Sequence, residues 1–489
     1  MNSRAITHGS ISQSLAIAVL IACLVGWVLA SEPPVASGQN PQPTGVPTRQ
    51  SSKPTGNSLL YLPVIYRNYS PPIPSLFGAQ FYDAFNSPAA AVPSAQEAHV
   101  YWARWPISWA SIEPTDTTPD QYRFADADAA ILAAHQAGIH LVANVVDNPS
   151  WASTYKNGVI DKVPFSKFAE FMGALAERYD GDGVNDAPGS PVVDYWEFYN
   201  EPDCGDSMYS DYGIAYWGPF GAQYAQMLCT VYPAIKAANL SAKVAMGGLA
   251  YDGFDDTGGP FKRQFLDDVL ANGGGACFDA MNFHYYPPSG PQWTAYGPGL
   301  SGKASYLRSK LQSYGWGSKP MIVTEAGWHS ENWWIYPSTP EIQSQYVVKL
   351  FTQSLASRLD LMIWWTWKDP GGGAGPNGLI TQSLQRKPSF TAFKVGAEKL
   401  NWAQVTFQRS LTSTELGNAN LEGYIFTLRA TQKPLYVLWS NDSVSRVVAL
   451  PVSQARVVDM YGNVSGIVNG SGTVQVTVGA NPLYVETIK

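Results

Sequence analysis

The pattern of apolar residues in two successive parts of the chain predicts its fold class. Between about residues 77 and 399, eight short apolar runs alternate with segments whose apolar residues recur at helical spacing. After Lys399 only short strand-like runs remain, separated by Asn, Gly, Ser and Asp and without a helical period. The sequence therefore predicts an α/β protein, with a (β/α)8 TIM barrel over residues 71–398 followed by a small all-β sandwich over residues 399–489.

The apolar runs are the expected strands of the barrel. They cover residues 77–82, 99–105, 139–146, 195–199, 243–246, 280–285, 321–324 and 361–367. Helices are expected at residues 124–138, 165–179, 224–238, 261–270 and 341–358, and Gly138 suits the end of the first of them. A doubly wound open sheet is the structural alternative, but no GxGxxG sequence follows the first run.

The strand-like runs of the C-terminal part cover residues 405–408, 424–428, 435–439, 446–450, 455–460, 473–478 and 483–488. They carry Trp439, but the alternation of their side chains reveals no cluster of exposed aromatic residues. This part is therefore expected to be a packed accessory domain that covers a face of the barrel, and not an independent binding module.

The first 70 residues carry export and linker signals. Residues 1–30 resemble a secretory signal peptide, because a polar segment with one Arg precedes a nearly continuous apolar run that ends at Ala30. Residues 31–70 form a linker rich in Pro, Ser and Gly. The protein is therefore predicted to be secreted or extracellular. The sequence leaves open whether the signal is cleaved or stays as a membrane anchor that attaches the protein to the cell surface.

Charge and composition exclude two classes of partner. The chain has 31 Lys and Arg against 38 Asp and Glu, a net charge of −7, without long runs of one sign. Nucleic acid and anionic membrane surfaces are therefore not expected as partners. The 17 Trp and 27 Tyr exceed what packing requires, and flat aromatic faces suit the rings of sugars.

Cysteine and motif content argue against a metal or a cofactor. After the signal segment only Cys204, Cys229 and Cys277 remain, so at most one bridge forms within the chain, and spacing does not assign its partners. No CxxC or HExxH sequence appears. Residues 297–304 nearly spell a phosphate-binding loop, but Ala304 stands where Mg²⁺ needs Ser or Thr. Neither a metal nor a cofactor is expected.

Two glutamates follow predicted strands. Asn200-Glu201-Pro202 closes the fourth run, and Glu325 closes the seventh. The carboxyl ends of barrel strands meet at one face. Two carboxylates there are what cleavage of a glycosidic bond needs, one to protonate the leaving oxygen and one to attack or to activate water. The alternative is two unrelated surface glutamates.

The strand ends together resemble those of the clan A retaining glycoside hydrolases, in the manner of family 39 or family 5, whose barrel often precedes a β-domain. That clan has Asn-Glu after the fourth strand and a second Glu after the seventh. The resemblance spans roughly residues 77–395. It also includes Arg104, the Asn-Pro-Ser-Trp of residues 148–151, the His-Tyr-Tyr-Pro of 284–287 and the Thr-Glu-Ala-Gly-Trp of 324–328.

The resemblance implies a role for each residue. Glu201 is the acid/base, protonated at rest, and Glu325 is the nucleophile, which must stay ionised. Arg104 and Tyr286 stabilise the charge of Glu325, and Asn200 donates a hydrogen bond to the 2-hydroxyl of the sugar. All five would lie at the mouth of the barrel.

Two further positions concern the walls of the site. Alternation along the eighth strand places Trp365 and Trp367 on one face, and Trp365 is preferred as the floor of the subsite that holds the reacting sugar. His284 either orients the surroundings of the nucleophile or is a core histidine with satisfied hydrogen bonds. Residues 285–303 are expected to form a long loop at the active face.

Four other acids are interpreted as non-catalytic. Glu197 has the same parity as Glu201, so we expect it to point into the barrel and to pair with a cation. Glu113 is expected to order a loop. Asp203 and Asp369 lie close enough to the mouth to bind sugar hydroxyls, but they are expected to be solvated loop acids.

The sequence thus predicts a secreted retaining β-glycoside hydrolase that cleaves oligo- or polysaccharide by double displacement. Two alternatives remain at this point: a non-catalytic carbohydrate-binding or surface protein on the same barrel, and a transglycosylase with the same two carboxylates. Related families act on xylosides, glucans, mannans or galactans, and the motifs do not distinguish among these sugars. The mode of action, endo or exo, also stays open.

Overall fold

The structure is a computed structural model that describes residues 75–82, 88–333, 335–371, 375–442 and 444–489. The predicted signal peptide and linker, residues 1–70, lie outside this part of the chain. Within the described ranges, no helix combines the length and apolarity that crossing a bilayer requires.

Eight parallel strands form the first domain, in the order β5-β4-β3-β2-β1-β8-β7-β6. The ring is completed between β5 and β6 by the isolated parallel bridges Ala245–Ala280 and Leu249–Phe283, so the barrel is nearly closed. This confirms the predicted TIM barrel. The strands are β1 (Phe77–Gln80), β2 (Trp102–Ser108), β3 (His140–Val146), β4 (Tyr195–Phe198), β5 (Lys243–Ala245), β6 (Met281–Tyr285), β7 (Met321–Ala326) and β8 (Met362–Trp364).

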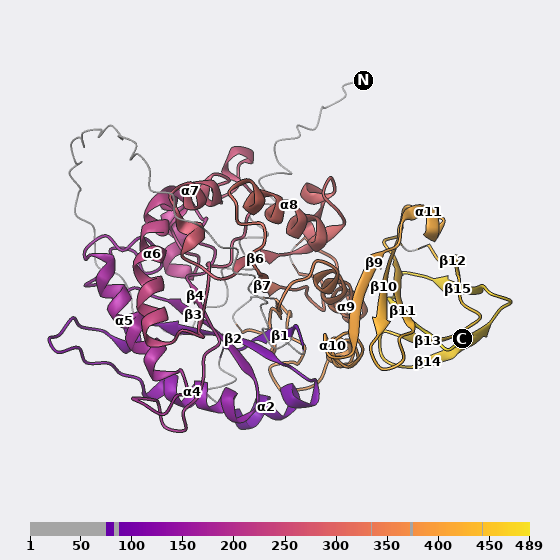
Figure 1. Ribbon diagram of the computed structural model, residues 1–489, viewed down its shortest axis with the longest axis horizontal. Helices are drawn as coiled ribbons and strands as arrows, with labels where there is room; N and C mark the ends of the chain where they lie inside the picture. The colour runs from indigo at the N-terminus through magenta and orange to yellow at the C-terminus, as the bar shows by residue number, and fades with distance from the viewer. Residues whose placement is uncertain (1–74, 83–87, 334, 372–374, 443) are drawn as a thin grey trace, which may run out of the picture.

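Helices surround the strands, as Figure 1 shows. Local sequence sets their ends: α9 begins after Thr339, whose Oγ1 accepts the Ile342 amide at 3.2 Å, and Gly138 follows α4 with a φ of +70°. The helices are α2 (Pro88–Glu97), α3 (Trp109–Ile112), α4 (Ala125–Gln136), α5 (Phe165–Arg178), α6 (Gly221–Ala238), α7 (Phe265–Ala271), α8 (Gly299–Ser313), α9 (Pro340–Ala356) and α10 (Pro388–Lys399).

The expected long loop at residues 285–303 is in part helical. It contains the 3₁₀ helix η6 (Pro287–Trp293), and its last residues form the first turn of α8. The prediction missed α8 because Gly299 and Gly302 obscure the helical pattern there. Gly302 is required by packing, since a Cβ would lie 2.4 Å from the Gly297 carbonyl oxygen.

The C-terminal domain consists of antiparallel sheets, which confirms the predicted all-β class. A six-stranded sheet has the order β14-β13-β16-β11-β10-β9, and β12 pairs with β15. The strand β14 was missed because most of its side chains are exposed, so it lacks an apolar pattern. The elements are β9 (Val405–Ser410), α11 (Ser413–Leu416), β10 (Leu421–Leu428), β11 (Pro434–Ser440), β12 (Arg446–Leu450), β13 (Gln454–Asp459), β14 (Val464–Asn469), β15 (Val474–Val478) and β16 (Leu483–Thr487).

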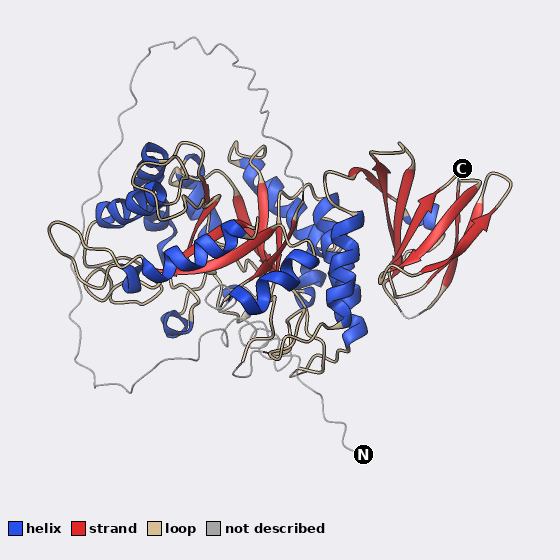
Figure 2. Cartoon of the chain, turned by 90° about the horizontal axis from the view of Figure 1, so that it is seen from below, coloured by secondary structure: helices blue, strands red, loops and turns tan. Residues whose placement is uncertain are grey.

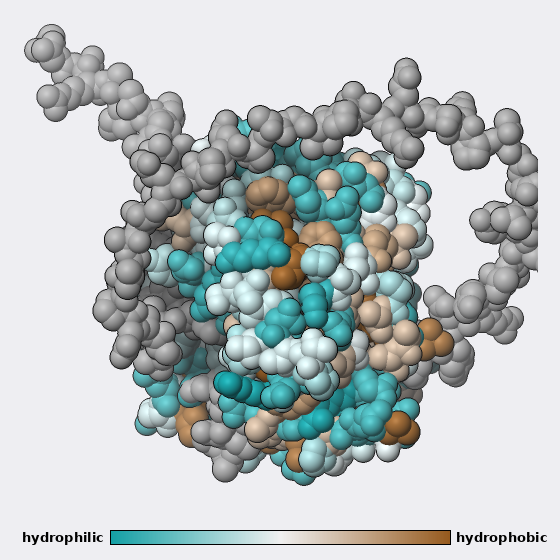
Figure 3. Space-filling view, turned by 90° about the vertical axis from the view of Figure 1, so that its left-hand side faces the viewer, coloured by the Kyte–Doolittle hydropathy of each residue, from teal (hydrophilic) through white to brown (hydrophobic). Residues whose placement is uncertain are grey.

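This domain packs beside α9 and α10, as Figures 1 and 2 show. Trp439 is fully buried and belongs to the same apolar cluster as the barrel helices. Polar contacts cross the junction, from Gln353 to Glu422 at 2.8 Å and from Lys399 to Glu486 at 2.6 Å. The face of the barrel turned away from this domain is mostly hydrophilic (Figure 3).

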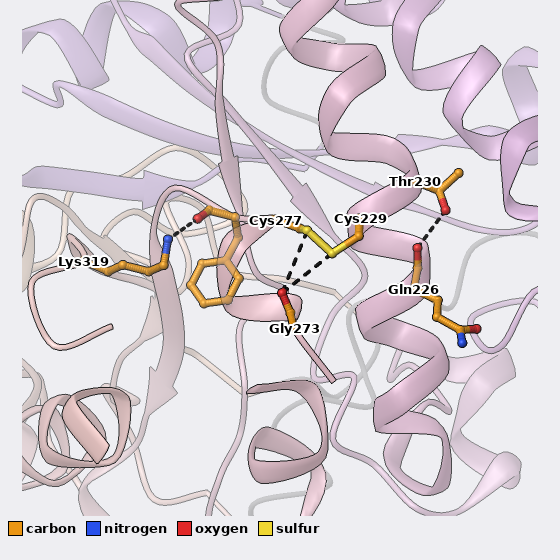
Figure 4. The surroundings of a disulfide bond; sticks show 7 residues. Gln226, Cys229, Thr230, Gly273, Cys277 and Lys319 are labelled. Atoms are coloured by element: carbon orange, nitrogen blue, oxygen red, sulfur yellow. Dashed lines mark hydrogen bonds between the residues drawn. A yellow bond between two sulfur atoms is a disulfide. The ribbon is translucent and has the colours of Figure 1, made fainter. Parts of the chain in front are cut away.

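One disulfide joins Cys229 on α6 to Cys277, which follows the 3₁₀ helix η5 (Gly274–Ala276) and precedes β6 (Figure 4). Cys204 stays a free, buried thiol, and burial raises its pKa to about 12. The bridge thus lies near the amino end of β6, whereas Glu201 and Glu325 lie at or beyond the carboxyl ends of strands.

Candidate active site

Two carboxylates converge at the mouth of the barrel. Glu201 follows β4 and Glu325 lies in β7, and only 1% and 3% of these residues are exposed. One oxygen of each carboxylate and a ring nitrogen of His284 all lie within 4.8 Å of one another. The predicted strand ends therefore bring both glutamates into one buried cluster.

Glu325 is held by two hydrogen-bond donors. Arg104 Nη1 lies 3.3 Å from its Oε2, and the Tyr286 hydroxyl donates to its Oε1. Burial raises the pKa of Glu325 above its ordinary value, while the positive charge of Arg104 and the hydrogen bond from Tyr286 act in the opposite direction. Both donors therefore favour the ionised form of Glu325, which burial of the carboxylate disfavours.

Arg104 also pairs with Glu197, which confirms the interpretation of that glutamate. Its Nε and Nη2 donate to the two Glu197 oxygens at 2.8 and 3.0 Å. Burial disfavours the cation, but attraction to Glu197 and Glu325 outweighs burial and raises the pKa of Arg104. Glu197 accepts further bonds from the Gly248 amide and the Thr324 hydroxyl, each at 3.0 Å. Its oxygens are thus fully engaged in structure.

Asn200 is oriented by the same guanidinium. Arg104 Nη2 donates to Asn200 Oδ1 at 2.9 Å. Because the amide oxygen is engaged in this way, the amide nitrogen is the part of Asn200 left to donate a hydrogen bond. Asn200 also lines the pocket described below.

The backbone that carries Glu201 is in a conformation that most residues avoid. Tyr199 and Glu201 have φ of +64° and +51°. Hydrogen bonds hold this shape: the Tyr199 amide donates to Val145 O at 2.9 Å, Asn144 Nδ2 donates to Tyr199 O at 2.9 Å, and the Glu201 amide donates to Gly248 O at 3.0 Å. The chain thereby fixes the direction in which the Glu201 side chain leaves β4.

His284 contacts both Glu201 and Thr324. Its Nδ1 lies 3.0 Å from Glu201 Oε1, and its Nε2 lies 3.3 Å from the Thr324 hydroxyl. Burial, followed by the positive charges of Arg104 and Lys303, lowers the pKa of His284 well below its usual value. Of the two readings of His284, the geometry favours a residue that orients the site, and it acts on Glu201.

Gly248 makes room for this histidine. A Cβ at position 248 would lie 2.1 Å from His284 Nε2 and 2.8 Å from Thr324 Oγ1. Any side chain here would displace the imidazole from Glu201. Sequence reasoning missed Gly248, since nothing local distinguishes it from other glycines.

The two tryptophans of the eighth strand separate, so the expectation of a shared face was wrong. Trp365 lines the pocket and donates through Nε1 to the Tyr82 hydroxyl at 2.8 Å. Trp367 is buried against Phe81 and Phe390, with ring centroids 5.7 Å away in each case. The reason is that β8 ends at Trp364, so strand alternation does not extend to residue 367.

Asp203 and Asp369 are not solvated loop acids. Asp203 is fully buried and accepts hydrogen bonds from the Ala250 and Tyr251 amides at 3.1 and 2.7 Å. Burial raises the pKa of Asp203 to about 7, although these two amides and the positive charge of Lys303 act in the opposite direction. Asp369 pairs with Lys387 at 2.6 Å. Both carboxylates hold loops together.

Glu113 accepts a hydrogen bond from Trp109 Nε1 at 2.7 Å, as expected of a residue that orders a loop. Glu113 is buried and is not one of the residues that line the pocket described next.

A small pocket opens beside Glu325. Several of its residues were missed by sequence reasoning, although Gln80 ends β1 and Asp147 directly follows β3, positions that the strand-end rule covers. The lining residues are Gln80, Tyr82, Arg104, Pro106, Asn144, Val146, Asp147, Asn157, Asn200, Tyr212, Gly213, Glu325 and Trp365.

Glu201, His284 and Glu325 also have the donor types of a metal site. However, Arg104 and the Tyr286 hydroxyl already occupy the Glu325 oxygens, and a guanidinium at 3.3 Å would repel a metal cation. The arrangement suits proton transfer and nucleophilic attack better than metal binding.

Comparison with known proteins adds family and fold. Residues 78–371 match the family described as Cellulase (glycosyl hydrolase family 5). No curated protein sequence matches the chain.

Several solved structures share the fold. A family 39 glycoside hydrolase from Bacteroides cellulosilyticus WH2 has 18% identity and a TM-score of 0.65, over 85% of this chain and 81% of that one. The family 39 enzyme from Xanthomonas axonopodis pv. citri has 15% identity and a TM-score of 0.55, over 85% and 95%. A family 30 endoxylanase from Clostridium papyrosolvens C71 has 12% identity and a TM-score of 0.55, over 84% and 96%.

Proposed function

The chain belongs to the cellulase family, glycosyl hydrolase family 5, and from this premise we propose that it is a secreted retaining β-glycoside hydrolase. Its substrate class is an oligo- or polysaccharide. Export rests on the signal-like residues 1–30. The single observation that carries the mechanism is the closeness of the Glu201 and Glu325 carboxylates.

This closeness favours retention of configuration. Inverting glycosidases keep their carboxyl groups about 6.5–9.5 Å apart to admit a water between base and sugar, whereas retaining enzymes keep them about 5–5.5 Å apart. Here one oxygen of each carboxylate lies within 4.8 Å of the other. This short separation supports direct attack by Glu325 over attack by a water that a carboxylate activates.

In the first step, Glu325 attacks the anomeric carbon while Glu201 gives its proton to the glycosidic oxygen. The bond between carbon and leaving oxygen breaks, and a glycosyl ester forms on Glu325. In the second step Glu201, now ionised, removes a proton from water, which attacks the same carbon. The ester breaks, Glu325 leaves as carboxylate, and the sugar retains its β-configuration.

The neighbours assist both steps. Arg104 and Tyr286 keep Glu325 ionised before attack and stabilise it as a leaving group afterwards. Asn200, oriented by Arg104, donates to the 2-hydroxyl of the reacting sugar, a contact that strengthens in the transition state. His284 contacts Glu201 through Nδ1 and so orients its carboxyl group.

Chemical rescue tests these roles. Glu325→Ala should lower kcat/KM on an activated aryl β-glycoside by at least about 10⁴-fold, because the nucleophile is lost. Azide should restore turnover by giving the α-glycosyl azide. Glu201→Ala should keep activity on substrates with good leaving groups, and azide should then yield the β-glycosyl azide.

The matched control is Glu398→Ala, which changes an exposed glutamate on α10 and should behave as wild type. An active Glu325→Ala variant, or β-azide from that variant, would contradict the assignment. A non-catalytic sugar-binding protein would show no turnover in any form.

A further inference from the structure

The pocket beside Glu325 lies on the glycone side of the bond to be cleaved. Glu325 and Asn200 line it, and Glu201 does not. In the proposed reaction the anomeric carbon meets Glu325, and the leaving group lies toward Glu201. This arrangement suits the pocket to the sugar that forms the ester, beside Asn200 and Trp365.

Asp147 forms part of the pocket wall and is held there firmly. It directly follows β3, is 5% exposed and has a φ of +59°. Its amide donates to Asn157 Oδ1 at 2.9 Å, and its carbonyl oxygen accepts the Ala110 amide at 2.8 Å. These two bonds hold the left-handed backbone in place.

The carboxylate of Asp147 has one engaged and one unengaged oxygen. Asn157 Nδ2 donates to Oδ1 at 3.0 Å, and Lys156 Nζ lies 3.7 Å from the same atom. Among the described residues none donates a hydrogen bond to Oδ2. An acceptor on the wall of a pocket is suited to a donor from a ligand.

Asn157 connects this wall to the rim of the pocket. Its amide donates to Ser210 Oγ at 2.8 Å and its Nδ2 to Ser210 O at 3.1 Å. Ser210 belongs to the 3₁₀ helix η2 (Ser207–Tyr212), which ends at Tyr212. Tyr212 is 50% exposed and lines the pocket, so it offers an aromatic face where a sugar chain would enter.

We propose that Asp147 determines glycone specificity by accepting a hydrogen bond from a hydroxyl group of the glycone. The inference rests on the proposed function and deepens it. An ionised carboxylate only accepts hydrogen bonds, so it selects hydroxyl donors. It also repels a carboxylate on the sugar. The substrate class is therefore a neutral glycoside, and glycosides of uronic acids are disfavoured.

The test combines enzyme variants with altered substrates. Wild type is first assayed on aryl β-glycosides of glucose, xylose, galactose and mannose and of their disaccharides, and the best substrate is chosen. Asp147→Ala should then lower kcat/KM about 10- to 100-fold, the range of a hydrogen bond to a charged group. Asp147→Asn, which keeps one acceptor, should lose less. Asp211→Asn, an exposed acid of η2, is the control and should match wild type.

Monodeoxy analogues of the chosen substrate identify the hydroxyl. At one position, removal of the hydroxyl should lower the kcat/KM of wild type by the same factor as Asp147→Ala does. The Asp147→Ala variant should show no further loss of kcat/KM with that analogue. The variants should also hydrolyse the aryl β-glucuronide better relative to the glucoside than wild type does.

The outcomes separate this inference from the proposed function. If wild type cleaves with retention but Asp147→Ala and Asp147→Asn behave as Asp211→Asn does, the Asp147 inference alone is overturned. Equal losses on every deoxy analogue, together with a lower melting temperature of both variants, assign Asp147 a structural role and also overturn it. If wild type cleaves no member of the panel and no polysaccharide, both proposals fail.

Discussion

Charged side chains are buried at the mouth of the barrel and lie near the surface in the C-terminal domain. At the mouth Arg104, Glu197, Glu201 and Glu325 are each at most 3% exposed. In the C-terminal domain the ion pair of Arg446 with Asp442 and the pair of Arg409 with Glu415 stay at the surface, and the core is apolar. Buried charge is costly to fold around. The comparison indicates that the mouth is built for chemistry, while the added domain contributes apolar burial.

The largest expected effect is on stability, and it should differ between the two regions when one arginine is replaced in each. Arg104→Met leaves Glu197 and Glu325 buried without their cation, and should lower the free energy of unfolding by about 3–5 kcal/mol. Arg409→Met removes an exposed pair and should leave stability unchanged within error. Urea unfolding measures both. Equal effects of the two substitutions would show that the mouth charges are not interdependent in the way the contacts indicate.

The disulfide should affect stability without affecting the mouth. It closes a stretch of 48 residues between α6 and the start of β6. Replacement of both Cys229 and Cys277 by Ser should lower the free energy of unfolding by about 2–4 kcal/mol, chiefly because the unfolded chain gains freedom. kcat/KM at 25 °C should stay as in wild type.

Reductant provides the control for the disulfide. Dithiothreitol should lower the melting temperature of wild type and of Cys204→Ala, and should leave the double variant unaffected. A double variant as stable as wild type would contradict the bridge, and a loss of kcat/KM in a folded double variant would contradict its separation from the mouth.

The pH dependence of catalysis should be the smallest effect and should arise at the mouth alone. Glu325 acts as a nucleophile only when ionised, so activity falls as the pH drops through its pKa. Burial raises that pKa above the ordinary value of a glutamate, so the acidic limb of kcat/KM should lie at higher pH than the titration of a solvent-exposed glutamate. Tyr286→Phe removes a hydrogen bond that lowers the pKa, and the limb should move to higher pH.

The comparison for this profile is Tyr436→Phe, which changes a tyrosine in the core of the C-terminal domain. Its profile should coincide with that of wild type. A Tyr286→Phe limb that stays in place or moves to lower pH would mean that Tyr286 does not stabilise the charge of Glu325.

Much of the barrel was predictable, because its strands are short apolar runs whose ends carry the polar residues. Glu201 and Glu325 were located by that rule together with the resemblance to clan A glycoside hydrolases, and Glu197 by its parity with Glu201. The elements that failed lack a local pattern. The exposed strand β14 has no apolar face, and α8 begins in a segment with glycines that also fit a loop.

The remaining errors concern burial, which sequence reports poorly for charged side chains. Asp203 reads as a loop acid because its partners, the Ala250 and Tyr251 amides, are almost 50 residues away. Asp147 was also missed, although it directly follows β3, and Asn157 and η2 complete its environment only in three dimensions. The pairing of Cys229 with Cys277 likewise depends on the packing of α6 beside η5.

The central claim is that the two buried glutamates cleave a β-glycoside through an ester on Glu325. The most direct test is the anomeric configuration of the first product, followed by proton NMR before mutarotation. Wild type acting on a β-glycoside should release the β-anomer first, and only later should the α-anomer accumulate. Initial release of the α-anomer would contradict the account, because inversion requires a water, and not Glu325, to attack the anomeric carbon.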